Sequence, residues 1–413
     1  MLRILNRFTG IGFACLLAGV LCGFMTGQHI GSAEASDRSR RLPNDSIPCN
    51  PGPWGELSYT PFTIGAPDDM VPVRNIEAAG IHWFLAGYTA DSFITLLQST
   101  SLTPDQQHQF LDPAVFHVQP DGVELTPSAD MIFSMPEDAR GKIYQILAQS
   151  TVNDSQMNFL SKDALDDQFS NSGISVETIA LFRRLCYERE GYLMFSGVSA
   201  ILSRIPTYEE KLHFAKALTR QRTMVLNLHL TARSDVEALA KYWGVGCFAT
   251  DVRSILRSLT AVPNGTYMNI QMVLPNLPSE EVYDYPNIID NPFDGPPVNR
   301  DCAWTSFNFF RDVPDPNFGK MEYVKRELNE NYHLITGAPR YGDVVLIARP
   351  DGFIVHVAVY LADDIWFTKN GSTVLHPWML STASDVLKQF QFQLASNEKL
   401  TVRYFRNKRL ENL

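Results

Sequence analysis

One stretch near the end of the chain, YGDVVLIARPDGFIVHVAVYLADDIWFTKNG at residues 341–371, constrains the fold more than any other part of the sequence. It holds three runs rich in β-branched and aromatic residues, which the short segments PDG (350–352) and ADD (362–364) separate. Such runs, with turn residues between them, are typical of consecutive antiparallel strands. The strands are expected at 343–349, 353–361 and 365–369, with a helix at about 382–390 and a further strand at 399–406.

The residues before this stretch follow a different period. From about residue 76 to residue 262, apolar residues recur every three to four positions behind helix start signals. The segment SDVEALAKYWG (234–244) shows the pattern, because a capping box opens it, apolar residues follow at helical spacing, and a glycine ends it. Three further capping boxes begin at Thr103, Ser134 and Thr207. This middle region is therefore predicted to be mostly helical.

The change of period predicts an α+β chain, in which a mostly helical N-terminal domain precedes a domain where a helix bearing Cys302 packs on an antiparallel sheet. Pro-, Gly- and Asp-rich composition before residue 76 favours an extended lead, and similar composition after residue 262 favours a connector. The expected parts are a leader at 1–35, the lead at 36–75, the helical domain at 76–262, the connector at 263–300 and the final domain at 301–413.

The first 35 residues have the layout of a secretory signal peptide. Arg3 and Arg7 precede a mostly apolar stretch without charges, and AEA at 33–35 forms a small-x-small cleavage site. An uncleaved membrane anchor is the alternative, since the stretch is just long enough to span a bilayer. The A-x-A ending favours cleavage, so we expect a secreted or periplasmic protein that is not membrane-bound afterwards. The net charge of −10 argues against nucleic acid as a partner.

Four cysteines lie outside this leader: Cys49, Cys186, Cys247 and Cys302. No C-x-x-C motif or Cys/His cluster has the spacing of a zinc site, so neither a metal nor another cofactor is expected. A sulfur in a disulfide cannot attack a carbonyl. If Cys302 is catalytic, it therefore stays a thiol, and any disulfide joins two of the other three.

Cys302 has the sequence context of a reactive thiol. Asp301 is a good N-cap residue, which makes Cys302 the first residue of a helix whose aromatic residues pack on the sheet. Backbone N–H groups and the positive end of the helix dipole favour a thiolate there. His356 lies in the middle predicted strand among apolar residues and is the candidate base, and His376 is a weaker alternative.

A third polar residue is needed to hold the imidazole in one tautomer. By strand alternation, Asn370 and Thr368 share one face of the strand next to that of His356, and Asn370 is the first choice. Trp304 and Lys369 are candidates for substrate contact, although a lysine there is more often a solvated charge at a strand end. A lone cysteine or a lone histidine in an apolar strand is also more often structural than catalytic.

Three segments occur in a recognisable order: DCAW at 301–304, GDVVLI at 342–347 and HVAVYL at 356–361. This order resembles the NlpC/P60 family of papain-like cell-wall peptidases, whose pattern is roughly D-C-S-G, G-D-L-V-F-F and H-V-G-I-Y-L. The similarity covers about the last quarter of the chain. The D-C-x-W-T and F-T-K-N-G segments, at 301–305 and 367–371, also resemble a group of secreted bacterial proteins of unassigned function.

The resemblance implies a papain-like domain at 301–413 that hydrolyses an amide bond in peptidoglycan stem peptides, through a thioester on Cys302 and with His356 as base. The family's third polar residue lies about a dozen residues after the histidine, which is Thr368 here. Two alternatives stay open. One is a wall-binding or scaffolding protein whose papain-like domain does not catalyse, and the other is an acyl or amide transferase that uses the same Cys302 and His356.

Overall fold

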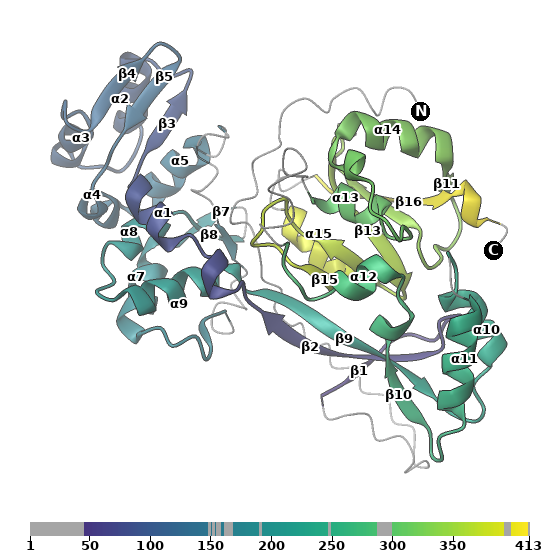
Figure 1. Cartoon of the computed structure of the whole chain (residues 1–413). Coiled ribbons are helices and arrows are strands. Elements are labelled where there is room, and N and C mark those ends of the chain that lie inside the picture. The colour runs from purple at the N-terminus through teal and green to yellow at the C-terminus, as the bar shows by residue number, and fades with distance from the viewer. Residues whose placement is uncertain are drawn as a thin grey trace, which may run out of the picture. The chain divides into compact units, whose positions relative to one another are not determined.

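The computed structural model describes residues 45–147, 150, 153, 158–160, 168–189, 192–246, 249–286, 300–391 and 398–411. The fold is α+β, as the sequence predicts (Figure 1). The described residues form two compact units. The main unit comprises the residues up to Ile64 and from Gln221 onward, and the inserted unit comprises Gly65–Arg220. The predicted leader at 1–35 and Cys247 lie outside the described residues.

The inserted unit interrupts a β-hairpin. Strands β2 (Glu56–Ile64) and β9 (Gln221–Leu230) pair antiparallel along their whole length, and Ile64 lies opposite Gln221. The predicted boundaries at 75 and 262 are therefore wrong, because the lead contributes β2 and the helical region contains β9. The sequence of β9, QRTMVLNLHL, buries nearly every second residue, a period of two that stands between two helical segments.

The hairpin belongs to a four-stranded sheet in the order β1-β2-β9-β10, with β1 at Ile47–Pro48 and β10 at Thr266–Asn269. Helices α10 (Val236–Trp243) and α11 (Ala249–Thr260) follow β9 in sequence and contact each other. The predicted helix at 234–244 is confirmed, and Asp235 caps it by accepting a hydrogen bond from the backbone of Ala238 at 3.0 Å. Trp243 is buried at the end of α10, where its Nε1 donates to the carbonyl of Trp54 at 3.0 Å.

The second sheet of the main unit has six strands, all antiparallel, in the order β11-β16-β12-β13-β14-β15. The strands are β11 (Tyr332–Ile335), β12 (Val344–Ala348), β13 (Ile354–Ala362), β14 (Ile365–Lys369), β15 (Trp378–Thr382) and β16 (Thr401–Asn407). The predicted meander is confirmed as β12, β13 and β14. The later helix is α15 (Ala383–Gln391), and the predicted strand at 399–406 is β16.

The six-stranded sheet has two differently covered faces. On the first, the α13 face, Val344, Leu346, Val357, Val359 and Phe367 share a core with α13 (Cys302–Phe307) and α14 (Met321–Asn331). On the second, the α15 face, Val345, Ile347, Ala358, Tyr360 and Trp366 share a core with Val386 and Phe390 of α15. Successive residues at 344–347 of β12 and at 357–361 of β13 therefore alternate between the two cores.

The Gly342–Asp343 pair at the start of β12 has a structural explanation. Gly342 has φ +86°, and a Cβ there would lie 2.2 Å from the ring of Phe310. The buried Asp343 carboxylate accepts two hydrogen bonds from the guanidinium of Arg406 in β16, at 2.8 and 2.6 Å. It also accepts one from the backbone of Arg340 at 2.7 Å. Both residues of the pair are thus needed for the fold.

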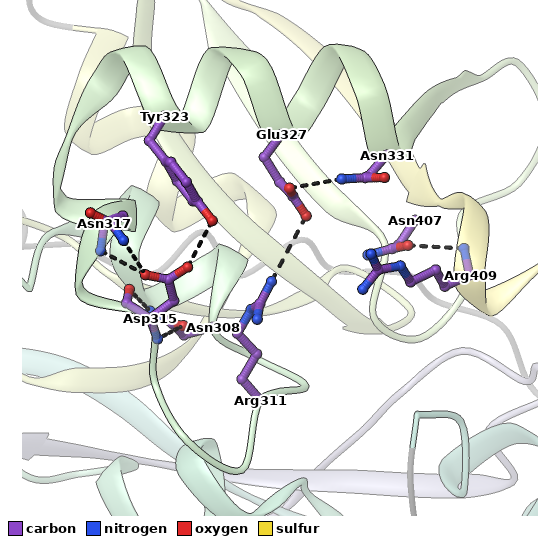
Figure 2. A network of polar contacts seen from close by, with 9 residues as sticks. All are labelled: Asn308, Arg311, Asp315, Asn317, Tyr323, Glu327, Asn331, Asn407 and Arg409. Atoms are coloured by element: carbon purple, nitrogen blue, oxygen red, sulfur yellow. Dashed lines mark hydrogen bonds and ion pairs between the residues drawn. The ribbon is translucent and has the colours of Figure 1, made fainter.

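A polar network fixes the loop between α13 and α14 (Figure 2). Asp315 accepts hydrogen bonds from the backbone and side chain of Asn317, both at 2.9 Å, and from the hydroxyl of Tyr323 at 2.8 Å. The side chain of Asn308 accepts from the backbone of Asp315 at 2.8 Å. These contacts tie the residue that follows α13 to the first turn of α14, so α13 is held at both ends.

The inserted unit contains helices and two small antiparallel sheets, β3-β5-β4 and β6-β8-β7. Its elements are α1 (Val73–Ala79), β3 (Trp83–Ala86), α2 (Ala90–Gln98), α3 (Pro104–Phe110), β4 (Phe116–Gln119), β5 (Gly122–Leu125), α4 (Ala129–Ser134), α5 (Glu137–Leu147), β6 (Asn158–Leu160), α7 (Val176–Leu185), β7 (Tyr187–Arg189), β8 (Tyr192–Phe195), α8 (Val198–Leu202) and α9 (Tyr208–Thr219). Thr103 and Thr207 cap α3 and α9 as the sequence predicts. The strands between these helices were not predicted.

In the part of the chain that the structure describes, no helix is long and apolar enough to cross a membrane.

We expect the main unit to fold without the inserted unit. Because Ile64 and Gln221 are direct partners in neighbouring strands, an Asn-Gly turn in place of residues 65–220 can close the hairpin. Circular dichroism and thermal unfolding of this shortened chain should show one cooperative transition. Aggregation of the shortened chain, with a soluble full-length control, would contradict the prediction.

Candidate functional site

Cys302 lies where the sequence places it, at the first position of α13. The carboxylate of Asp301 accepts hydrogen bonds from the backbone N–H groups of Ala303 and Trp304, both at 2.9 Å, so the predicted N-cap is confirmed. Burial raises the pKa of Asp301, and hydrogen bonds from the same N–H groups and the charge of Lys369 oppose that rise. Cys302 is half-buried and is a thiol, not part of a disulfide. The carboxylate of Asp301 thus already accepts two of the backbone N–H groups at the start of the helix that Cys302 begins.

Contacts of Thr305 and Trp304 dock α13 on β15. The hydroxyl of Thr305 donates to the carbonyl of Asp301 at 2.7 Å and accepts from Nε1 of Trp378 at 2.9 Å. The rings of Trp304 and Trp378 lie 6.3 Å apart. Trp304 is 3% exposed, so it is part of the core under α13, and the predicted substrate contact is not supported by this position.

Lys369 is fully buried, with 0% of its surface exposed. It pairs with Trp378 across β14 and β15, and its Nζ donates to the carbonyls of Gly371 at 2.8 Å and Thr373 at 2.9 Å. The interpretation of Lys369 as a solvated charge is therefore wrong. Lys369 shares its parity in β14 with Phe367 of the α13 face, and its charge opposes the rise in the pKa of Asp301.

His356 is the start of a hydrogen-bonded relay on the α15 face. Its Nε2 lies 2.7 Å from the hydroxyl of Thr368, which donates to Oδ1 of Asn370 at 2.8 Å. Because the Thr368 proton points to Asn370, the Thr368 oxygen accepts from Nε2–H of His356. The Asn370 amide in turn donates to Oε1 of Gln389 in α15 at 2.7 Å, and Phe390 stacks on the imidazole at 4.5 Å.

The relay settles the order of the two candidate third residues. Thr368 contacts the imidazole directly, and Asn370 contacts Thr368 instead of the ring. The first choice, Asn370, is therefore wrong as the direct partner of His356. The spacing of twelve residues between His356 and Thr368 was the signal that pointed to the correct one.

The predicted pair of Cys302 and His356 is not assembled. Cys302 packs on the core of the α13 face, whereas the ring of His356 stacks on Phe390 and bonds Thr368 on the α15 face. The backbone of the sheet lies between them, since neighbouring residues of a strand point to opposite sides. The contacts of His356 with Thr368 and Phe390 leave the pair with Cys302 unsupported, and this catalytic pair stays a prediction.

Burial lowers the pKa of His356 to about 3, so its imidazole is neutral at physiological pH. His376, the alternative base, is also buried. Its Nδ1 lies 2.8 Å from the hydroxyl of Thr373, and burial together with the charge of Lys369 lowers its pKa to about 3. A Cβ on Gly371 would lie 2.4 Å from the His376 ring, which requires a glycine there. Both histidines are thus packed as neutral core residues.

The other described cysteines are also thiols, Cys49 half-buried and Cys186 buried. Burial raises the pKa of each to about 12. Within the described residues, no group of three or more His, Cys, Asp or Glu side chains could hold a metal ion. The residues that sequence reasoning missed are Gln389 and Phe390, which α15 brings to the histidine by a tertiary contact that no local pattern encodes.

Comparison with family models, with curated proteins and with solved structures finds no match to this chain.

We expect the reactivity of Cys302 to be independent of His356. Because the two side chains lie on opposite faces, the His356→Gln variant and the wild type should label at Cys302 with iodoacetamide at rates that agree within about twofold. This agreement should hold at each pH from 6 to 9. Mass spectrometry of the peptide that carries Cys302 measures the rate, and Cys302→Ala gives the background. A large decrease in the rate for His356→Gln, with native circular dichroism, would show that the thiol and the imidazole interact.

The free energy of unfolding should fall as the pH decreases below 6.5. His356 has a folded-state pKa below its unfolded value, so the unfolded chain binds the extra proton, and the stability is present above about pH 6.5 and is lost towards pH 3. The loss for one histidine approaches about 1.4 kcal/mol per pH unit in this window. Urea unfolding at pH 7 and at pH 5 gives the loss in the free energy of unfolding between the two pH values. This loss should be about 2 kcal/mol smaller for His356→Gln than for the wild type. The exposed His108→Gln is the control and should match the wild type.

Proposed function

We propose that this protein is an exported wall-binding or scaffolding protein whose papain-like part does not use the chemistry of Cys302 and His356. One observation carries the proposal: Cys302 and His356 lie on opposite faces of the six-stranded sheet. A base that activates a thiol must lie within hydrogen-bond reach of it, directly or through one water. Here the backbone of β13 lies between the core that Cys302 packs on and the core that contains the His356 ring.

The surroundings of His356 also support a structural role. The imidazole is 2% exposed, is covered by Phe390, and has its Nε2–H bonded to Thr368. A general base must accept a proton near neutral pH, and a folded-state pKa of about 3 makes that unfavourable. Turning His356 toward Cys302 would require a shift of one residue in the pairing of β13, which would also exchange the two cores.

The partner follows from the resemblance to cell-wall peptidases and from the leader. A signal peptide at 1–35 would place the protein outside the cytoplasm, where peptidoglycan or another peptide is the expected ligand. The acidic net charge of −10 disfavours nucleic acid.

One observation favours a second candidate, an exported cysteine peptidase, amidase or transferase that acts through Cys302. The relay of His356, Thr368 and Asn370 holds the imidazole in the Nε2–H tautomer, which leaves Nδ1 as the basic nitrogen. An oriented ring of this kind is also what a catalytic base requires. This candidate needs a rearrangement that brings both groups to one face.

Purified cell-wall sacculi distinguish the two candidates. We expect wild type, Cys302→Ala and His356→Gln to sediment with sacculi equally, and mass spectrometry of the incubated material to show no new fragment with any of them. Fragments that appear with wild type and disappear with Cys302→Ala would establish the second candidate. Absence of sedimentation for all three proteins would reject the wall as the partner.

A further inference from the structure

A second feature of the main unit does not involve Cys302. A cavity of about 360 Å³ opens where α10 and α11 meet the segment from the 3₁₀ turn Ile270–Val273 to α12 (Asn276–Glu281). This volume is at the lower end of the range for small-molecule sites, and it fits one long side chain or a small ligand. Every described residue that lines the cavity belongs to the main unit.

The floor of this cavity is apolar. Trp243, Val252, Val273 and Leu274 line it and are buried in the core of the main unit. Met272, at the mouth, is 57% exposed, which is unusual for a large apolar side chain. An aliphatic chain that enters would lose contact with water against these groups, at a gain of about 25 cal/mol for each Å² of apolar surface.

The rim of the cavity is negatively charged. Asp251 and Glu280 are exposed, and neither has an ion-pair partner among the described residues. Among the described residues that line the cavity, none is a lysine or an arginine. The nearest cations along the chain bind other acids: Arg253 and Arg257 bind Glu237 at 2.9 and 2.8 Å, and Arg300 lies 3.6 Å from Glu281.

The neutral polar groups of the lining already have hydrogen-bond partners. The hydroxyl of Ser279 donates to the carbonyl of Gln271 at 2.9 Å, and the amide of Asn276 donates to Asp312 at 3.1 Å. Among the described lining residues, the groups left to select a ligand are therefore the two carboxylates and the apolar floor. Together they are complementary to a group with an aliphatic stem and a positive end.

We propose that this cavity binds the side chain of a lysine-type residue in a peptide, with the ammonium group at Asp251 and Glu280 and the methylene stem on the floor beside Trp243. A carboxylate ligand would be repelled by both acids, and an uncharged chain would leave them without a partner. The proposal deepens the binding function above, and it rests on that function only for the peptide as the source of the amine.

Nα-Acetyl-lysine methylamide is the probe, and the methyl signal of ¹³C-labelled Met272 is the readout, assigned with Met272→Leu. We expect the probe to shift this signal. We also expect the analogue with an acetylated ε-amine to bind to the wild type at least about tenfold more weakly than the probe does. The probe itself should bind to the double variant Asp251→Asn/Glu280→Gln more weakly by the same factor. The control Asp105→Asn/Glu209→Gln removes two exposed carboxylates from the inserted unit and should bind as the wild type does.

Equal binding of the probe and its acetylated analogue, or undiminished binding to Asp251→Asn/Glu280→Gln, would overturn the proposal. Hexylamine tests whether the amine comes from a peptide or from a free alkylamine. A site for free amines would bind hexylamine more tightly than the peptide-like probe, and that result would also contradict the proposal. Sedimentation with sacculi is measured separately. If the probe binds but sacculi do not, the wall-binding function fails and the cavity proposal stands.

Discussion

The alternation of side chains in the six-stranded sheet determines what the main unit can do. In the central part of β13, from Val357 to Leu361, each residue is committed to the α13 face or to the α15 face by its parity, and both faces are covered by helices and filled with apolar side chains. His356 shares its parity with Ala358 and Tyr360, so it belongs to the α15 face. A shift by one residue would bury the wrong set of side chains on both faces, which makes the register strongly defined.

The same constraint explains why Cys302 and His356 could be predicted one by one but not as a pair. The N-cap at Asp301, the helix start at Cys302, the meander and the strand position of His356 all follow from local patterns, and the structure confirms each of them. Which face of a sheet a helix covers is decided by distant parts of the chain. In a strand that is covered on both faces, the residues of both faces are apolar, so the sequence does not indicate which face a given residue belongs to.

The domain boundaries were missed for a related reason. Strands β2 and β9 pair with each other, yet the whole inserted unit separates them in sequence, and the partner of each is invisible to a local window. In β2, Pro61 and the surrounding Pro- and Gly-rich residues favoured an irregular segment. An insertion at a hairpin end is compatible with both units, because the two chain ends that must meet are already neighbours in the sheet.

The resemblance to NlpC/P60 peptidases rests largely on residues that the fold itself needs. Gly342 is required by its positive φ and by the ring of Phe310, and Asp343 by the guanidinium of Arg406. The apolar residues that follow His356 fill the two cores. A chain that kept only the architecture of such a domain would retain these residues whether or not it kept the chemistry. Evidence for catalysis must therefore come from the contact between thiol and base, and in this structure the strand β13 separates the two groups.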